Sequence, residues 1–287
     1  LILSFDCSRI SLLFISCSQS GNEHINQHGS KEDSIIKSKV ERQPTDSLIQ
    51  ALGENTKSAK DLTRMLVYKE LGERMRNESR FQEAISYHQQ GLRLANKLKD
   101  TIGITLALNN LGTNFRRIGD MSEASEYHFL ALQTAEAYSG KNSKLGRKSK
   151  VVAMNGIGNV YLSIEDYEKA TMYFREALVE EKKLKSTLGQ AINYANLGAI
   201  FEKQALLDSA YYYYQLSYEQ NLLANSPMDI GLSHINFGHI FERKEDYLQA
   251  QIEYQQAYTM LNEIADKWHK LETIIALARI HLLKNDL

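Results

Sequence analysis

A repeat of about forty residues constrains the fold of this chain more than any other feature. A glycine preceded by a large apolar residue recurs after 40, 46, 40 and 40 residues, at Gly72, Gly112, Gly158, Gly198 and Gly238. An alanine follows each glycine after twelve residues, and a histidine or an aromatic residue follows it after sixteen. A fixed period of this length is the signature of a repeat architecture, in which each unit packs only on its neighbours.

Each unit has the spacing of two successive helices. Apolar residues three or four apart form one face of a first helix around the glycine and one face of a second helix after it. Asp120, Asp166 and Asp246 stand where a carboxylate could cap the second helix. Glycine within a helix costs about 1 kcal/mol relative to alanine, so we infer a close helix approach. We expect the later alanine to meet the glycine and the residue after sixteen to fill the space toward the next unit.

Three segments carry this pattern most clearly: ALNNLGTNF (107–115), NGIGNVYLSIEDYEKA (155–170) and ANLGAIFEKQ (195–204). They resemble the tetratricopeptide repeat (TPR) family, in a 40-residue variety like that of bacterial TPR lipoproteins and the sensor regions of bacterial regulators. The resemblance covers about residues 65–287. It implies an all-α fold, a right-handed α-solenoid of antiparallel helix hairpins.

The ends of the chain suggest further segments. Residues 45–287 are expected to form the solenoid, with a lead-in helix over 45–64, about 5.5 repeats and a truncated C-terminus. Residues 22–44 are polar and are expected to be a flexible linker. Residues 1–21, which lack a starting Met, are typical of a signal or lipoprotein leader.

Cys17 is the candidate lipidation site within that leader. The residues from Phe14 to Cys17 resemble a bacterial lipoprotein signal, which implies a lipid on Cys17 and a membrane tether. The alternative is an apolar N-terminal tail without a targeting role.

Composition and motifs argue against several classes of function. The 34 Lys and Arg residues nearly balance 35 Asp and Glu, which argues against bulk nucleic-acid binding. Both cysteines precede residue 20, so the repeats hold no cysteine metal site. We find no phosphate-binding loop or nucleophile motif, and expect no enzyme activity, cofactor or metal. The basic stretch 139–150 is interpreted as a solvated loop between hairpins, with a docking patch as the alternative.

The TPR resemblance implies that the first helices line a concave groove. Its candidate residues are Asn109, Asn110, Thr113, Arg116, Arg117, Asn155, Asn159, Asn196, Lys203, Asn236, His239 and Arg243. Each Asn amide offers both donors and acceptors to an extended peptide backbone. The alternative is that these Asn side chains bond between adjacent helices.

Two functions follow from this. The first is a non-enzymatic scaffold that binds a protein or peptide segment in the groove, tethered through Cys17 in the bacterial envelope and facing the periplasm. The second is the sensory region of a bacterial transcriptional regulator or histidine kinase, whose output domain would lie beyond residue 287. In that case the region could be cytoplasmic.

Overall fold

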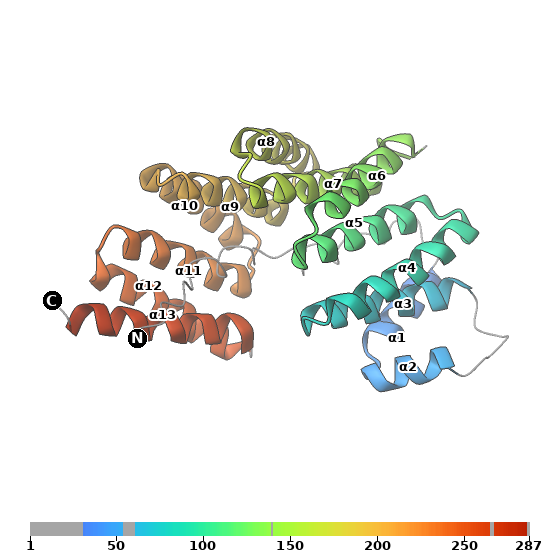
Figure 1. The fold of residues 1–287 in the computed structure, drawn as a ribbon, viewed down its shortest axis with the longest axis horizontal. Coiled ribbons are helices and arrows are strands. Elements are labelled where there is room, and N and C mark those ends of the chain that lie inside the picture. The colour runs from blue at the N-terminus through green and yellow to red at the C-terminus, as the bar shows by residue number, and fades with distance from the viewer. Residues whose placement is uncertain (1–30, 54–60, 139, 265–266, 286–287) are drawn as a thin grey trace. The chain divides into compact units, whose positions relative to one another are not determined.

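A computed structural model describes residues 31–53, 61–138, 140–264 and 267–285, and their regular structure is entirely helical (Figure 1). The helices are α1 (Lys31–Glu41), α2 (Thr45–Gly53), α3 (Asp61–Asn77), α4 (Phe81–Leu98), α5 (Thr101–Arg117), α6 (Met121–Ala137), α7 (Lys144–Ser163), α8 (Tyr167–Leu184), α9 (Thr187–Lys203), α10 (Leu207–Leu223), α11 (Pro227–Arg243), α12 (Tyr247–Glu263) and α13 (Lys267–Asn285). The all-α prediction is confirmed. The helices group into an N-terminal unit, which ends at Tyr173, and a C-terminal unit, Phe174–Leu287.

Each repeated glycine lies inside the first helix of a hairpin, from α3–α4 to α11–α12, and α13 occupies the first-helix position of a sixth unit. The turn inside each hairpin places one residue, seven after the glycine, in the left-handed region. These residues are Ser79, Gly119, Glu165, Ala205 and Glu245, with φ between 59° and 89°. The predicted caps are confirmed: the carboxylates of Asp120, Asp166 and Asp246 each accept a hydrogen bond from the backbone N–H three residues later, at 3.1 Å.

In the hairpins α3–α4, α5–α6, α9–α10 and α11–α12, the ring sixteen residues after the glycine lies directly on that glycine. A Cβ atom at Gly112 or Gly198 would approach the ring of His128 or Tyr214 to 2.7 Å, and one at Gly238 would approach Tyr254 to 2.5 Å. The nearest neighbour of the glycine is thus the ring, and the expected contact with the alanine stays a prediction. The expectation that the ring fills space toward the next unit is confirmed at three positions: His128 also lies against Gly156 of α7. Tyr214 shares a core cluster with Ile240 of α11, and Tyr254 shares one with Ile280 of α13.

The residue four after the glycine accepts a hydrogen bond from the ring in both hairpins that use tyrosine. In the C-terminal unit, the Tyr214 hydroxyl donates to Glu202 at 2.7 Å and the Tyr254 hydroxyl donates to Glu242 at 2.7 Å. Burial raises the pKa of both tyrosines, so each hydroxyl remains a donor. Two further pairs combine arginine with histidine, Arg76 with His88 and Arg116 with His128.

The structure differs from the expected linker over residues 31–41. These residues form α1, and Val40 of α1 packs with Leu48 of α2 and with Val67 and Leu71 of α3. The apolar residues near the end of α1 cover the first hairpin, which explains why a polar-looking segment folds. Of the lead-in helix expected over 45–64, α2 covers Thr45–Gly53 with Leu48 buried, whereas the residues from Asp61 onward already belong to α3. Residues 22–30 of the expected linker, and the leader 1–21 with Cys17, lie outside the described residues.

The basic stretch 139–150 is not a loop over most of its length. α7 begins at Lys144, and Ser143 caps it by accepting a hydrogen bond from the Gly146 N–H at 3.1 Å. Leu145 and Ser149 are buried, so one side of this basic turn faces the protein interior. The extra residues of this repeat therefore lengthen a helix instead of forming only a loop.

The glycine–ring contact can be tested in the N-terminal unit. We expect Gly112→Ala to destabilise the protein by ~1–3 kcal/mol, because the added methyl overpacks against His128. Gly91→Ala is the matched control, since its nearest neighbour outside its own helix lies at 3.7 Å. That control should stabilise the protein by up to ~1 kcal/mol. Equal effects of the two variants in chemical denaturation would contradict the contact.

The buried histidines predict loss of stability in acid. Burial, and then Arg116, lowers the pKa of His128 from 6.5 to about 3. As pH falls below 6.5, the unfolded chain binds a proton that the folded chain does not, so the free energy of unfolding should fall between about pH 6.5 and 3. His128→Phe should reduce this slope by at most ~1.4 kcal/mol per pH unit. Denaturation at several pH values measures the slope, and an unchanged slope would show that His128 does not titrate in this way.

Candidate functional site

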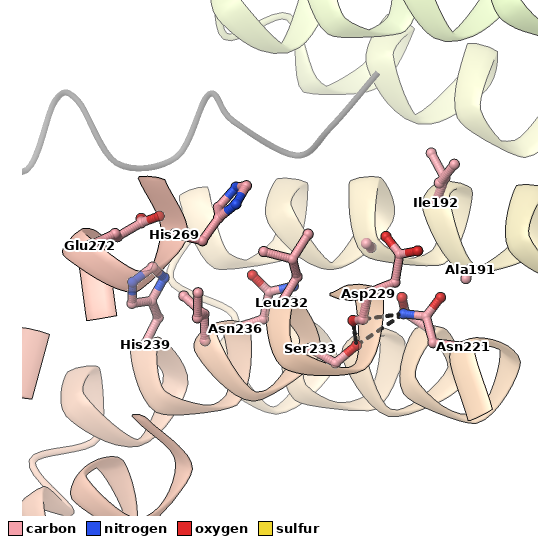
Figure 2. Close-up of a pocket in the computed structure, with 13 residues that line it drawn as sticks. Ala191, Ile192, Asn221, Asp229, Leu232, Ser233, Asn236, His239, His269 and Glu272 are labelled. Carbon is pink, nitrogen blue, oxygen red and sulfur yellow. Dashed lines mark hydrogen bonds between the residues drawn. The ribbon is translucent and has the colours of Figure 1, made fainter. Parts of the chain in front are cut away.

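A cavity of about 50 Å³ opens on the C-terminal unit among the first helices α9, α11 and α13 (Figure 2). Its polar lining consists of Ser217, Asn221, Asp229, Ser233, Asn236, His239, His269 and Glu272. Its apolar lining consists of Ala191, Ile192, Ala195, Leu232 and Ile235. The three first helices supply most of these residues.

A small hydrogen-bond network joins α10 to α11 at one end of the cavity (Figure 2). The Asn221 amide donates to the Asp229 carbonyl at 3.1 Å and to the Ser233 hydroxyl at 3.0 Å. The Ser233 hydroxyl donates to the same Asp229 carbonyl at 2.9 Å. Asn221 is only 4% exposed, and its Oδ1 atom is buried without a hydrogen-bond partner. An acceptor left in this state favours a ligand that brings a donor.

The electrostatics of the cavity are acidic. Asp229 and Glu272 line it together with two histidines, and its lining contains no Lys or Arg. Burial raises the pKa of Asp229, against the opposing effects of the Ser226 hydroxyl and of His269. The Asp229 carboxylate is therefore under-solvated, and an incoming cation would be favoured beside it.

Two predicted groove residues, Asn236 and His239, line the cavity. The His239 ring packs against Tyr254 with centroids 5.8 Å apart, and its Nδ1 atom is buried without a hydrogen-bond partner. Asn196 is only 2% exposed on α9 and does not line the cavity.

The predicted residues near the ends of α9 and α11 lie elsewhere. Lys203 and Arg243 are exposed, and Arg243 bonds to the Glu202 carbonyl and lies 3.8 Å from its carboxylate. Neither side chain lines the cavity.

The remaining predicted residues belong to the N-terminal unit, and two of them bond between helices. Asn109 is buried with its Oδ1 atom 3.1 Å from His128 Nδ1, and Asn110 accepts a hydrogen bond from Arg76 at 2.8 Å. At these two positions the geometry favours the alternative of inter-helix bonding. Thr113, Arg116 and Asn155 are buried, whereas Arg117 and Asn159 are half-buried.

Sequence reasoning missed Asn221, Asp229, His269 and Glu272. Asn221 belongs to a second helix, and the other three lie before the positions that were taken as the groove. A signal was present, since Asp229 and His269 are separated by one period of 40 residues, and so are Leu232 and Glu272. Extending the register toward the start of each first helix would have found them.

The described ranges contain no group of three or more His, Cys, Asp or Glu side chains placed to hold a metal ion. No helix in the part of the chain that the structure describes has the length and apolar character needed to cross a membrane.

A scan against models of known protein families finds no match. Solved structures are similar in fold. A Rap protein complexed with competence and sporulation factor has a TM-score of 0.68 at 16% identity, over 84% of this chain and 68% of that chain. The Rap conjugation gene regulator of plasmid pLS20, in complex with the Phr* peptide, has a TM-score of 0.66 at 15% identity, over 85% and 72%.

A third similar structure extends the likeness beyond the Rap proteins. A signal transduction ATPase with a tetratricopeptide repeat sensor, from Pyrococcus horikoshii, has a TM-score of 0.57 at 16% identity, over 89% of this chain and 41% of that chain. At these identities the likeness concerns the fold. The chain has the helical-repeat fold of tetratricopeptide-repeat proteins, an α-solenoid of helix hairpins.

Proposed function

We propose that the cavity among α9, α11 and α13 binds an extended polypeptide segment that carries a basic side chain. The observation that carries this proposal is the set of acceptors in the cavity. Asn221 Oδ1 is buried without a partner, and Asp229 and Glu272 add two carboxylates. An N–H donor from a peptide would satisfy an acceptor that the fold leaves unpaired.

The polar groups divide into two roles. The half-buried Asn236 amide offers a donor and an acceptor, which suits the alternating N–H and C=O groups of an extended backbone. The Asp229 carboxylate suits a positively charged side chain, because burial disfavours its charge and the cavity lining contains no Lys or Arg. A volume of about 50 Å³ fits a few water molecules or the head group of one side chain. The rest of the segment would lie along the open face.

Two similar folds support a binding role. One Rap structure contains the Phr* peptide, and the tetratricopeptide repeat region of the ATPase is described as a sensor. We therefore propose a binding or sensory role in place of catalysis. Lipid attachment at Cys17, location in the bacterial envelope and an output domain beyond residue 287 stay predictions.

A peptide array tests the binding proposal. Among short random peptides, we expect the full chain to retain those with Lys or Arg and to lose them when the basic residue becomes Glu. Asn236→Ala should lower the affinity for a selected peptide by ~10-fold, which is the effect of about one lost hydrogen bond. Gln255→Ala, at an exposed amide on α12 outside the cavity, should leave the affinity unchanged. Retention without preference for basic residues would exclude the acidic cavity as the site.

Asp229→Asn should weaken peptide binding without lowering the stability of the protein. Because burial raises the pKa of Asp229, the folded protein disfavours the charged carboxylate at neutral pH. Removing the charge should therefore slightly raise the melting temperature at pH 7 while it weakens binding of a basic peptide by about tenfold or more. Thermal melts and titration calorimetry on the same samples measure both effects. A variant that is less stable and binds equally well would oppose both parts of this account.

A further inference from the structure

The two partners of the Asn221 side chain determine which way its amide points. Its Nδ2 group donates one hydrogen to the Asp229 carbonyl at 3.1 Å and the other to the Ser233 hydroxyl at 3.0 Å. A carbonyl can only accept, and the Ser233 hydroxyl donates its own proton to that same carbonyl. A flipped amide would place its oxygen against two acceptors. Asn221 therefore offers the cavity an acceptor, Oδ1, which is buried without a hydrogen-bond partner.

The Asp229 carboxylate lies at the same end of the cavity as the Asn221 amide (Figure 2). Ser226, the residue before α11, donates its hydroxyl proton to the Oδ2 atom of Asp229. A ligand that bound both carboxylate oxygens would have to displace this hydrogen bond. A ligand that binds one oxygen, Oδ1, would leave it intact.

Guanidinium and ammonium groups differ in the partners that suit them. A guanidinium is planar, binds a carboxylate best through two parallel N–H···O bonds and stacks on aromatic rings. An ammonium is compact and donates three hydrogens to separate acceptors. The described residues that line the cavity include no Phe, Tyr or Trp, and its two histidines lie toward the other end (Figure 2). Separate acceptors, an occupied carboxylate oxygen and a volume of about 50 Å³ match the ammonium.

We propose that this end of the cavity binds a primary ammonium group, that of a lysine side chain or of a free N-terminus, in preference to a guanidinium. The inference rests on the proposed function, in which the cavity binds a basic segment, and it identifies the basic group. Two ammonium hydrogens would be donated to Asn221 Oδ1 and Asp229 Oδ1. The third would be donated to water or to the remaining lone pair of the Ser233 hydroxyl.

Three versions of one peptide retained on the array test the proposal by titration calorimetry with the full chain. The first has an acetylated N-terminus and one lysine, and the second has arginine in place of that lysine. The third has alanine there and a free N-terminus. If a side chain supplies the ammonium, the first should bind at least ~10-fold more tightly than the second, about one hydrogen bond. If the N-terminus supplies it, only the third should bind.

Two results of this titration would overturn the proposal. One is an arginine version that binds as tightly as the better of the other two, which would leave the proposed function standing. The other is loss of binding in all three versions. An array that retains no basic peptide would remove the proposed function as well.

Ser226→Ala tests why the guanidinium is disfavoured. Without this hydroxyl, both oxygens of Asp229 are open to a bidentate arginine, so the ratio of the ammonium to the arginine affinity should fall toward one. Ser122→Ala, at an exposed position on α6 outside the cavity, is the control and should keep the original ratio. Lower stability alone would weaken both peptides equally. An unchanged ratio in Ser226→Ala would therefore overturn the role given to Asp229 Oδ2.

Discussion

The contact between a ring on the second helix and a glycine on the first determines how the hairpins α3–α4, α5–α6, α9–α10 and α11–α12 pack. A side chain at the glycine would occupy the space of the ring, as the distances of 2.7 Å at Gly198 and 2.5 Å at Gly238 demonstrate. The cost of a helical glycine, about 1 kcal/mol, is therefore offset by burial of a large ring. The alanine twelve residues after each glycine is fully buried in the same helix pairs, as at Ala210 and Ala250.

The residue type four positions after the glycine varies with the ring that makes this contact. Once a tyrosine is buried on the glycine, its hydroxyl needs a partner, and in the C-terminal unit the residue four after that glycine supplies it. Tyr with Glu satisfies a donor with an acceptor, as in Tyr214 with Glu202. Across the chain the pairs at these positions are Arg with His twice, Leu with Phe once and Glu with Tyr twice. The residue four after the glycine and the ring sixteen after it therefore vary together. This is expected, because a buried polar group needs a hydrogen-bond partner.

Much of this could be predicted from the sequence, and the failures have physical reasons. Periodicity predicted the helices and the capping role of Asp120, because both depend on local spacing. It did not predict that the ring lies on the glycine, since spacing along the chain does not specify the rotation of the second helix. α1 was missed because two or three apolar residues, such as Val40, suffice to hold a mostly polar helix on α3.

The candidate site was only partly predictable. Asn236 and His239 line the cavity, but Asn109 takes part in an inter-helix bond and Asn221 comes from a second helix. Whether an Asn faces a ligand or a neighbouring helix depends on what the adjacent hairpin offers as a partner, which one repeat does not reveal. The most direct test of the account is hydrogen–deuterium exchange of the full chain with and without a selected basic peptide. We predict slower exchange in α9, α11 and α13. Protection confined to α3–α6, or no protection at a saturating peptide concentration, would contradict it.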